Sequence, residues 1–360
     1  MIQGLVVFLV VGIAALGRAE EQGFDVNAFF QEVRRAQTTL NYRAEQRIYA
    51  VSLPRSILAR FQVTCVSPHK KRERIDGSPQ ERVVFLEDGT HLWTYVPKRA
   101  LVIKKSVQHE TTDFLPCHFY DDVELIKKNY MIVAKGNFPS SNVMCQVLAF
   151  IPKHNNRHIR EIWFERERKL PVRIYLYTRE GRPSYLAELD NIEWNPRVDK
   201  DTFHLMVPPG TKVYEIVEQG NLSLEEAQRL MQLPLVLPPR IPAGFCPFNI
   251  LVRFEGDHRK AQVVYSDGLS SLSVFEERTP PARAVDGGTH GGTHGGTGAG
   301  QRTASMVSAG GSGETNNPFV SRYGLLNVLS CDLKGMRATL VGDIDENDLL
   351  DTVRSLAALE

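Results

Sequence analysis

The sequence predicts an α+β protein: a broad, curled antiparallel sheet with helices over one face, followed by a smaller antiparallel α+β domain. About ten short segments between residues 42 and 207 alternate apolar and polar residues, as strands with one buried face do. Turn sequences such as Asp76-Gly77 and Asp88-Gly89 separate these segments. Few helical patterns interrupt the series, whereas a parallel sheet would need a helical crossover between neighbouring strands.

Length and charge limit the possible classes of protein. A chain of 360 residues exceeds what one hydrophobic core usually holds, so we expect two domains. Its 43 Lys and Arg against 42 Asp and Glu give no general attraction for nucleic acid, whose binding requires neutralisation of many phosphates. Residues 5–16 are apolar and precede Gly17-Arg18-Ala19. This pattern is typical of a signal peptide over residues 1–19, and we therefore expect export.

The first domain is expected to span residues 24–213. Asp25 can cap a helix with one buried stripe, formed by Val26, Phe29, Val33, Ala36 and Leu40. A second, short helix is expected within 119–130. Strands are predicted at residues 42–51, 57–65, 83–86, 92–96, 101–104, 131–134, 144–152, 159–167, 172–178, 185–194 and 203–207.

A linker is predicted over residues 214–240. It contains a short helix capped by Ser223, and it ends in a proline-rich stretch that favours an extended chain. The second domain, 241–358, is predicted to hold a hairpin that turns at Ser266-Asp267-Gly268, further strands and a closing helix capped by Asp345. The glycine-rich segment 286–313 is predicted to be a flexible insertion.

The sequence contains no complete catalytic or metal-binding motif, so we expect no enzyme activity, no metal and no cofactor. The segment 109–113, HETTD, has Asp where a zinc protease motif requires its second His. Cysteines are few and scattered. In an oxidising compartment Cys246 and Cys331 are the first candidates for a disulfide because both lie in the second domain. Cys65 and Cys145 occupy apolar strand faces and are expected in the core.

A curled sheet with an apolar inner side, partly roofed by helices, can enclose a cavity suited to an acyl chain. The candidate lining residues are Phe61, Val63, Trp93, Tyr95, Trp163 and Tyr175. The alternative is that these side chains fill an ordinary core, because alternation does not tell which face of a sheet curls inward.

The hairpin sequence Tyr265-Ser266-Asp267-Gly268-Leu269 resembles the C-terminal domain of the RseB/MucB family, periplasmic regulators of envelope-stress sigma factors. Residues 242–245, PAGF, are similar to the start of that domain, and Val341-Gly342 to its end. RseB-type proteins share a LolA/LolB-type half-barrel, and three segments of the first domain resemble it: residues 76–96, 163–181 and 203–211.

The resemblance implies a periplasmic regulator that binds the periplasmic part of a membrane-anchored anti-sigma factor. Such a regulator protects its partner from proteolysis until a lipid, a lipoprotein acyl chain or lipopolysaccharide binds. We take the hairpin residues as candidates for partner binding: Tyr265, Ser266, Asp267, Gly268 and Leu269. A periplasmic lipoprotein or lipid carrier of LolA type is the alternative, and homo-oligomerisation stays open. An enzyme acting on envelope polymers would have no candidate residues.

Overall fold

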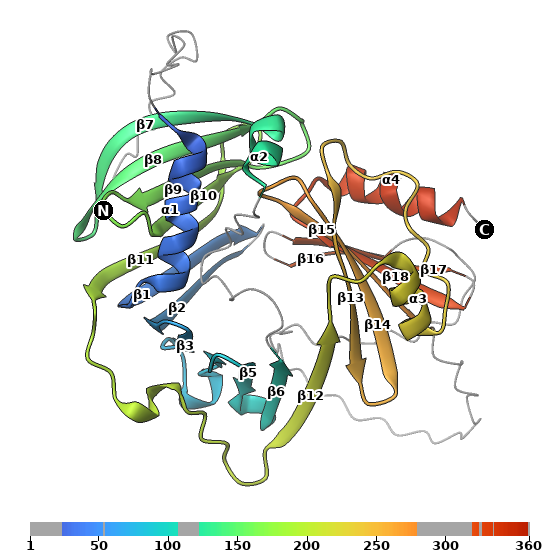
Figure 1. The fold of residues 1–360 in the computed structure, drawn as a ribbon, viewed down its shortest axis with the longest axis horizontal. Coiled ribbons are helices and arrows are strands. Elements are labelled where there is room, and N and C mark those ends of the chain that lie inside the picture. Colours follow the sequence, from blue (N-terminus) through green and yellow to red (C-terminus); the bar gives the residue numbers. More distant parts are fainter. Residues whose placement is uncertain are drawn as a thin grey trace, which may run out of the picture.

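A long series of paired strands builds most of the molecule (Figure 1). The computed structural model describes residues 24–52, 55–106, 122–278, 319–323, 326–333 and 335–358. The predicted signal peptide, the glycine-rich insertion and the segment 109–113 lie outside these residues. Within the described ranges, no helix has the length and apolar character needed to cross a membrane.

The first half of the molecule runs from α1 to β11. Its helices and strands are α1 (Val26–Thr39), β1 (Tyr42–Ser52), β2 (Arg55–Val66), β3 (His69–Arg74), β4 (Val84–Glu87), β5 (His91–Val96), β6 (Leu101–Ser106), α2 (Val123–Asn129), β7 (Tyr130–Ser140), β8 (Val143–Pro152), β9 (Ile159–Glu165), β10 (Pro171–Tyr177) and β11 (Pro183–Trp194). Short 3-10 helices lie at Pro79–Glu81, Pro97–Arg99 and Lys200–Phe203.

The second half runs from α3 to α4, and one strand, β12 (Lys212–Gln219), joins it to the first. Its helices and strands are α3 (Leu224–Met231), β13 (Cys246–Glu255), β14 (His258–Ser266), β15 (Ser271–Arg278), β16 (Phe319–Tyr323), β17 (Leu326–Leu333), β18 (Met336–Gly342) and α4 (Glu346–Ala357).

Backbone pairing connects the strands in the order β7-β8-β9-β10-β11-β1-β2-β3-β4-β5-β6-β12-β13-β14-β15-β18-β17-β16. These pairs are antiparallel except β6 with β12, which run parallel. The sheet of the first half curls without closing into a barrel (Figure 1). The predicted fold class, a curled antiparallel half-barrel followed by a smaller antiparallel α+β part, is confirmed.

Helix α1 forms where the capping pattern places it. The Asp25 carboxylate accepts hydrogen bonds from the backbone N–H groups of Asn27 and Ala28, which satisfies donors that a helix start leaves open. Phe29 lies on the sheet, with its ring centroid 5.0 Å from that of Phe164 on β9. The core beneath α1 is continuous across the curled sheet, with buried members Val63, Leu148, Ile162, Ile174 and Leu189.

The second half has its own apolar interior. Helix α4, capped by Asp345 as predicted, buries Leu349, Val353 and Leu356 against the sheet. Helix α3 begins at Ser223, whose hydroxyl accepts from the Glu226 backbone N–H while the Glu226 carboxylate accepts from the Ser223 N–H. The division of the chain into domains near residue 240 stays a prediction.

One predicted strand is wrong. Residues 203–207 do not pair: a 3-10 helix ends at Phe203, and an irregular stretch follows before β12 begins at Lys212. Pro208 and Pro209 have no backbone N–H to donate to a neighbouring strand, and Met206 is 82% exposed, so this stretch has neither the hydrogen bonds nor the burial of a strand.

Candidate functional site

The register of the strands decides on which side of the first-half sheet each predicted cavity residue lies. Directly paired residues of neighbouring strands share a face, and successive residues of one strand alternate between faces. Pairing runs from Val63 through β3 and β4 to Thr94. Phe61 therefore shares a face with Val63, whereas Trp93 and Tyr95, on either side of Thr94, lie on the opposite face.

The face that carries Phe61 and Val63 is the one that α1 covers, and we call it the inner face. Both side chains are buried there. Trp93, on the outer face, donates its indole N–H to the Asp88 carboxylate at 2.8 Å in the turn between β4 and β5. The Lys104 ammonium lies 5.5 Å from the Trp93 ring centroid.

Trp163 and Tyr175 also lie on the outer face. Their strand neighbours Ile162 and Ile174 pair with each other and are completely buried on the inner face. The Arg173 guanidinium lies 4.9 Å from the Trp163 ring centroid. The structure thus keeps Phe61 and Val63 together and places the other four candidates on the far side of the sheet. An acyl-chain site on the inner face stays a prediction.

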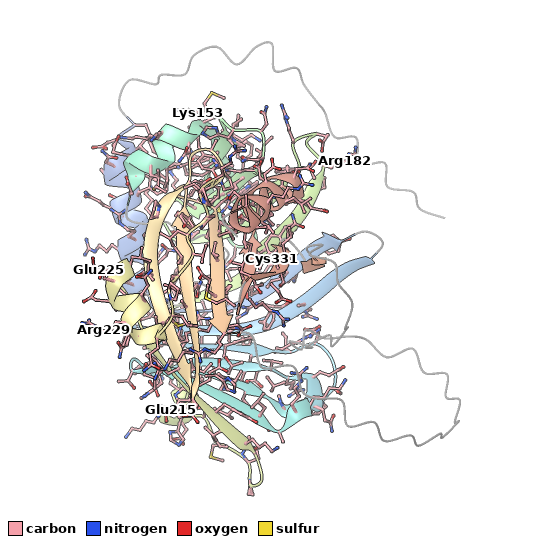
Figure 2. All side chains as sticks on the ribbon, turned by 90° about the vertical axis from the view of Figure 1, so that its right-hand side faces the viewer. Lys153, Arg182, Glu215, Glu225, Arg229 and Cys331 are labelled. Carbon is pink, nitrogen blue, oxygen red and sulfur yellow. The ribbon has the colours of Figure 1, made fainter. Side chains whose placement is uncertain are left out.

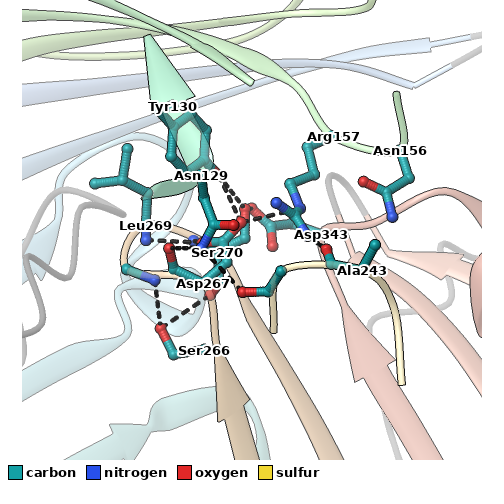
Figure 3. A network of polar contacts seen from close by, with 12 residues as sticks. Asn129, Tyr130, Asn156, Arg157, Ala243, Ser266, Asp267, Leu269, Ser270 and Asp343 are labelled. Carbon is teal, nitrogen blue, oxygen red and sulfur yellow. Dashed lines mark hydrogen bonds and ion pairs between the residues drawn. The ribbon is translucent and has the colours of Figure 1, made fainter. Parts of the chain in front are cut away.

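The predicted partner-binding hairpin lies at the junction of the two halves. Ser266 and Asp267 have no solvent exposure, and Tyr265 and Leu269 are nearly as buried. Figure 3 shows this loop meeting residues of the first half. Because the hairpin is covered in this arrangement, partner binding through it would require the two halves to separate locally. Its role in partner binding stays a prediction.

Asp267 is the centre of the junction (Figure 3). Its Oδ1 atom accepts from the backbone N–H groups of Leu269 at 2.9 Å and Ser270 at 2.6 Å, which shapes the turn. Its Oδ2 atom accepts from the Tyr130 hydroxyl of β7 at 2.7 Å. The Nε atom of Arg157 lies 2.9 Å from the same Oδ2 in an ion pair. Two first-half side chains therefore meet one second-half carboxylate.

Further polar contacts extend this junction. Asn129, at the end of α2, donates to the backbone carbonyls of Gly244 at 2.9 Å and Asp267 at 3.0 Å. Arg160 of β9 donates to the Ser270 hydroxyl at 2.8 Å and pairs with the Asp343 carboxylate. Burial raises the pKa of the Tyr130 hydroxyl far above its usual value, so this group stays protonated and donates.

Gly268 allows the close approach of the two halves. Its φ of +101° lies in a region that side chains rarely adopt, and a Cβ atom here would stand 2.7 Å from Cγ1 of Ile126 on α2. The Ile126 backbone nitrogen would be only 3.0 Å away. A glycine is therefore required between Asp267 and Leu269 for the hairpin to fit against α2.

A second connection between the halves runs through β12. Residues 212–216 of β12 pair with β6, and residues 217–219 pair with β13. The nearly buried Glu218 of β12 lies 2.9 Å from the Lys105 ammonium on β6 and 2.6 Å from Nε of Arg253 on β13. Burial alone would raise its pKa, but these two cations hold the pKa of the Glu218 carboxyl below its usual value.

The surface beside this strand is polar. Glu215 of β12 pairs with Lys104 of β6 at 2.9 Å, and Figure 2 shows Glu215 near one end of the molecule. Glu225 and Arg229 of α3 are exposed and point away from the sheet (Figure 2). Glu225 and Arg229 thus lie on the side of α3 that faces solvent and take no part in the junction.

The candidate disulfide between Cys246 and Cys331 is not formed. The Cys246 thiol is free and donates to the backbone carbonyl of Ser266 at 3.5 Å, so it does not bond to Cys331. Cys65 and Cys145 are buried in the first-half core, in agreement with the sequence. In the part of the chain that the structure describes, no group of three or more His, Cys, Asp and Glu side chains is arranged to hold a metal ion.

Sequence reasoning did not find the first-half residues of the junction. Tyr130, Arg157 and Arg160 belong to no motif, and each is more than 100 positions away in the sequence from the hairpin residue that it contacts. Asp267 itself carries a weak signal for a junction. It is an acidic turn residue between two apolar strands, and such a residue can be buried only if it has hydrogen-bonding partners. The identity of those partners depends on the docking of the halves.

The curled sheet, the second α+β half, the shared strand and the buried junction together define a class of two-part, mostly antiparallel sheet proteins. The profile of the MucB/RseB N-terminal domain matches residues 25–204. The chain therefore belongs to the MucB/RseB family. The sigma-E factor regulatory protein RseB of Escherichia coli strain K12 and that of Shigella flexneri are each 25% identical to it over 184 residues. These matches cover 47% of this chain and 51% of each relative, about half of their length.

Solved structures of the family extend the likeness in fold to both halves. MucB in complex with MucA(peri) matches with a TM-score of 0.56 and 14% identity, over 91% of this chain and 97% of MucB. A complex of Pseudomonas aeruginosa MucA and MucB matches with a TM-score of 0.55 and 15% identity, over 89% and 94%. The shared fold thus includes the half that the family profile does not reach.

Proposed function

We propose that this chain is a periplasmic regulator of an envelope-stress sigma factor. It binds the periplasmic segment of a membrane-anchored anti-sigma factor and shields that segment from proteolysis until a lipid-like molecule binds. The observation that carries the proposal is the fold match to MucB in complex with MucA(peri) over nearly the whole chain, in addition to family membership. A lipid carrier would need only the curled first half.

Binding and protection are tested with the mature chain and the periplasmic segment of a single-pass anti-sigma factor from the same genome. We expect the fluorescence anisotropy of the labelled segment to rise on addition of the chain. We also expect cleavage of the segment by a site-specific envelope protease to slow when the chain is present in excess. An unrelated segment of matched length and charge is the control.

The lipid response is a separate arm of the same experiment. Addition of lipopolysaccharide or a lysophospholipid should release the segment and restore cleavage. No binding of the segment by the chain, together with co-purification of acylated lipoproteins, would overturn the regulator and support the carrier. Binding without any effect on cleavage would overturn protection and leave partner binding in place.

A further inference from the structure

Arg72 of β3 projects from the inner face of the curled sheet among aromatic rings. Its guanidinium carbon lies 3.7 Å from the ring centroid of Phe61 on β2 and 5.4 Å from that of Phe85 on β4. Register confirms the placement, since Arg72 pairs with Val63 on one side and Phe85 on the other. A cation is therefore placed in the apolar lining of the half-barrel.

Two other cations of the inner face, Arg74 and Lys105, have acidic partners, and Arg72 differs from them. Arg74, two residues along the same strand, pairs with Asp76 at 2.8 Å, and Lys105 of β6 pairs with Glu218 at 2.9 Å. Among the residues that the structure describes, no carboxylate pairs with Arg72. Its Nε atom is shielded from solvent and has no hydrogen-bond acceptor. Burial lowers the pKa of Arg72 to about 10, so the side chain remains charged at neutral pH.

The apolar surface around Arg72 is only partly covered. Side chains beneath α1, such as Ile162 and Ile174, have no exposure, whereas Ile48, Phe85 and Tyr185 pack at the margin of the same core and stay half-buried. A half-buried apolar surface beside an uncompensated guanidinium offers both an apolar contact area and a charged end. An aromatic ring stabilises such a cation but leaves its in-plane N–H donors available.

We propose that Arg72 binds the anionic end, a carboxylate or a phosphate, of an amphiphile whose apolar chain lies on the inner face beside Phe85. The proposal deepens the proposed function, on whose lipid-like signal it rests, by assigning the charge of the molecule that is sensed. The planar guanidinium can donate two parallel hydrogen bonds to either anion; an ammonium cannot accept such bonds, and a neutral headgroup accepts them more weakly. Arg72 is then a specificity-determining residue.

The test measures binding of three twelve-carbon amphiphiles to the full chain by isothermal titration calorimetry below their micellar concentrations. Dodecanoate and dodecyl phosphate carry the two candidate anions, and dodecyltrimethylammonium carries the same chain with a positive charge. We expect both anions to bind about tenfold or more tightly than the cation, as a charge-assisted hydrogen bond provides. Equal binding of all three would overturn the proposal.

Arg72→Gln should remove that preference, with the anions weakened about tenfold and the cation unchanged. Lys71→Gln is the matched control, because it removes the same charge from the adjacent residue on the outer face, where Lys71 pairs with Glu73 at 3.3 Å. This control should keep the preference. Arg72→Lys, which keeps the charge without the fork, should give an intermediate result and guards against a folding defect in Arg72→Gln.

The outcome separates this proposal from the proposed function when binding of the anti-sigma segment is measured on the same variants. A chain that binds the segment but shows no charge preference among amphiphiles overturns the role of Arg72 alone. If the anion preference depends on Arg72 but the chain does not bind the anti-sigma segment, the role of Arg72 is supported and the regulator function is overturned. Loss of segment binding without loss of amphiphile binding in Arg72→Gln would assign Arg72 to an acidic side chain of the partner and overturn the proposal.

Discussion

Arg157 and Asp267 form an ion pair between the two halves of the molecule, and neither side chain is exposed to solvent. The Arg157 guanidinium also lies 4.6 Å from the ring centroid of Phe245 and donates to the backbone carbonyl of Ala243. Removal of two charges from water is costly, and that cost is offset only while both partners are present. The pair therefore favours the one arrangement of the two halves in which Arg157 and Asp267 meet.

Asp267→Asn should destabilise the chain strongly, by about 3–5 kcal/mol, because it leaves the Arg157 charge buried and unpaired. The measurement is the free energy of unfolding in guanidinium chloride. Asp332→Asn is the matched control, since Asp332 pairs with Arg337 at 2.8 Å on the surface and should cost at most about 1 kcal/mol. Equal costs for the two variants would contradict the role assigned to the buried pair.

Tyr130→Phe removes the hydroxyl that donates to Asp267 and should cost about 1–3 kcal/mol, because a buried acceptor loses one of its donors. Tyr214→Phe is the control, because Tyr214 is 56% exposed. The free energy of unfolding of this variant should stay close to that of the native chain. In a double-mutant cycle, Tyr130→Phe and Asp267→Asn should be non-additive. Additive costs would indicate that the two groups act independently.

Gly268→Ala should destabilise the contact with α2, because its Cβ atom would lie 2.7 Å from Cγ1 of Ile126 and the φ of +101° is strained for alanine. The control is Gly256→Ala in the turn between β13 and β14. Gly256 has a φ of +59°, and no atom lies within 4 Å of the added Cβ. Its substitution should therefore cost only the backbone strain of a left-handed conformation, about 1–2 kcal/mol. Thermal unfolding of the two variants gives the comparison, and a cost for Gly268→Ala no larger than the control would refute the steric account.

Glu276 of β15 makes stability depend on pH. Its side chain is completely buried, and its carboxyl accepts the backbone N–H of Val236 at 2.9 Å. Burial raises the pKa of Glu276 from 4.5 to about 7. Above pH 4.5 the unfolded chain releases this proton while the folded chain keeps it, so the contribution of Glu276 to stability falls between pH 4.5 and about 7 and stays low above.

Glu276→Gln should remove this pH dependence, because the amide resembles the protonated carboxyl and does not ionise. We expect the variant and the native chain to have similar free energies of unfolding at pH 4.5. At pH 8 the variant should be more stable by roughly 3 kcal/mol, the free energy that corresponds to the raised pKa. A constant difference at both pH values would contradict the burial of an ionisable carboxyl at this position.

The sequence predicts the helices and most strands well because their signals are local. Asp25, Ser223 and Asp345 each cap the helix that follows them, at the residue where the pattern places the cap. The faces of the curled sheet are a different matter. Phe61 and Trp93 look alike in an alternating pattern, and only pairing through β3 and β4 shows that they lie on opposite sides.

The junction could not be predicted for a related reason. Arg157 lies in a turn region of the first half, and its side chain would normally be solvated there. It is buried because a loop 110 residues further along the chain docks on it. Contacts of this kind form only when the two folded halves pack against each other. Composition and periodicity describe local structure and therefore do not reveal them.

Strand β12 restricts movement between the two halves more than a proline-rich linker alone would. Its main chain is hydrogen-bonded to β6 at one end and to β13 at the other, so the two sheets share one uninterrupted piece of backbone. The segment paired with β6 ends at Ile216 and the segment paired with β13 begins at Val217, so rotation of one half against the other has to bend β12 between these residues or break bonds at one of its ends. A displacement of either half is thus passed to the other through hydrogen-bonded main chain, and not through a flexible linker.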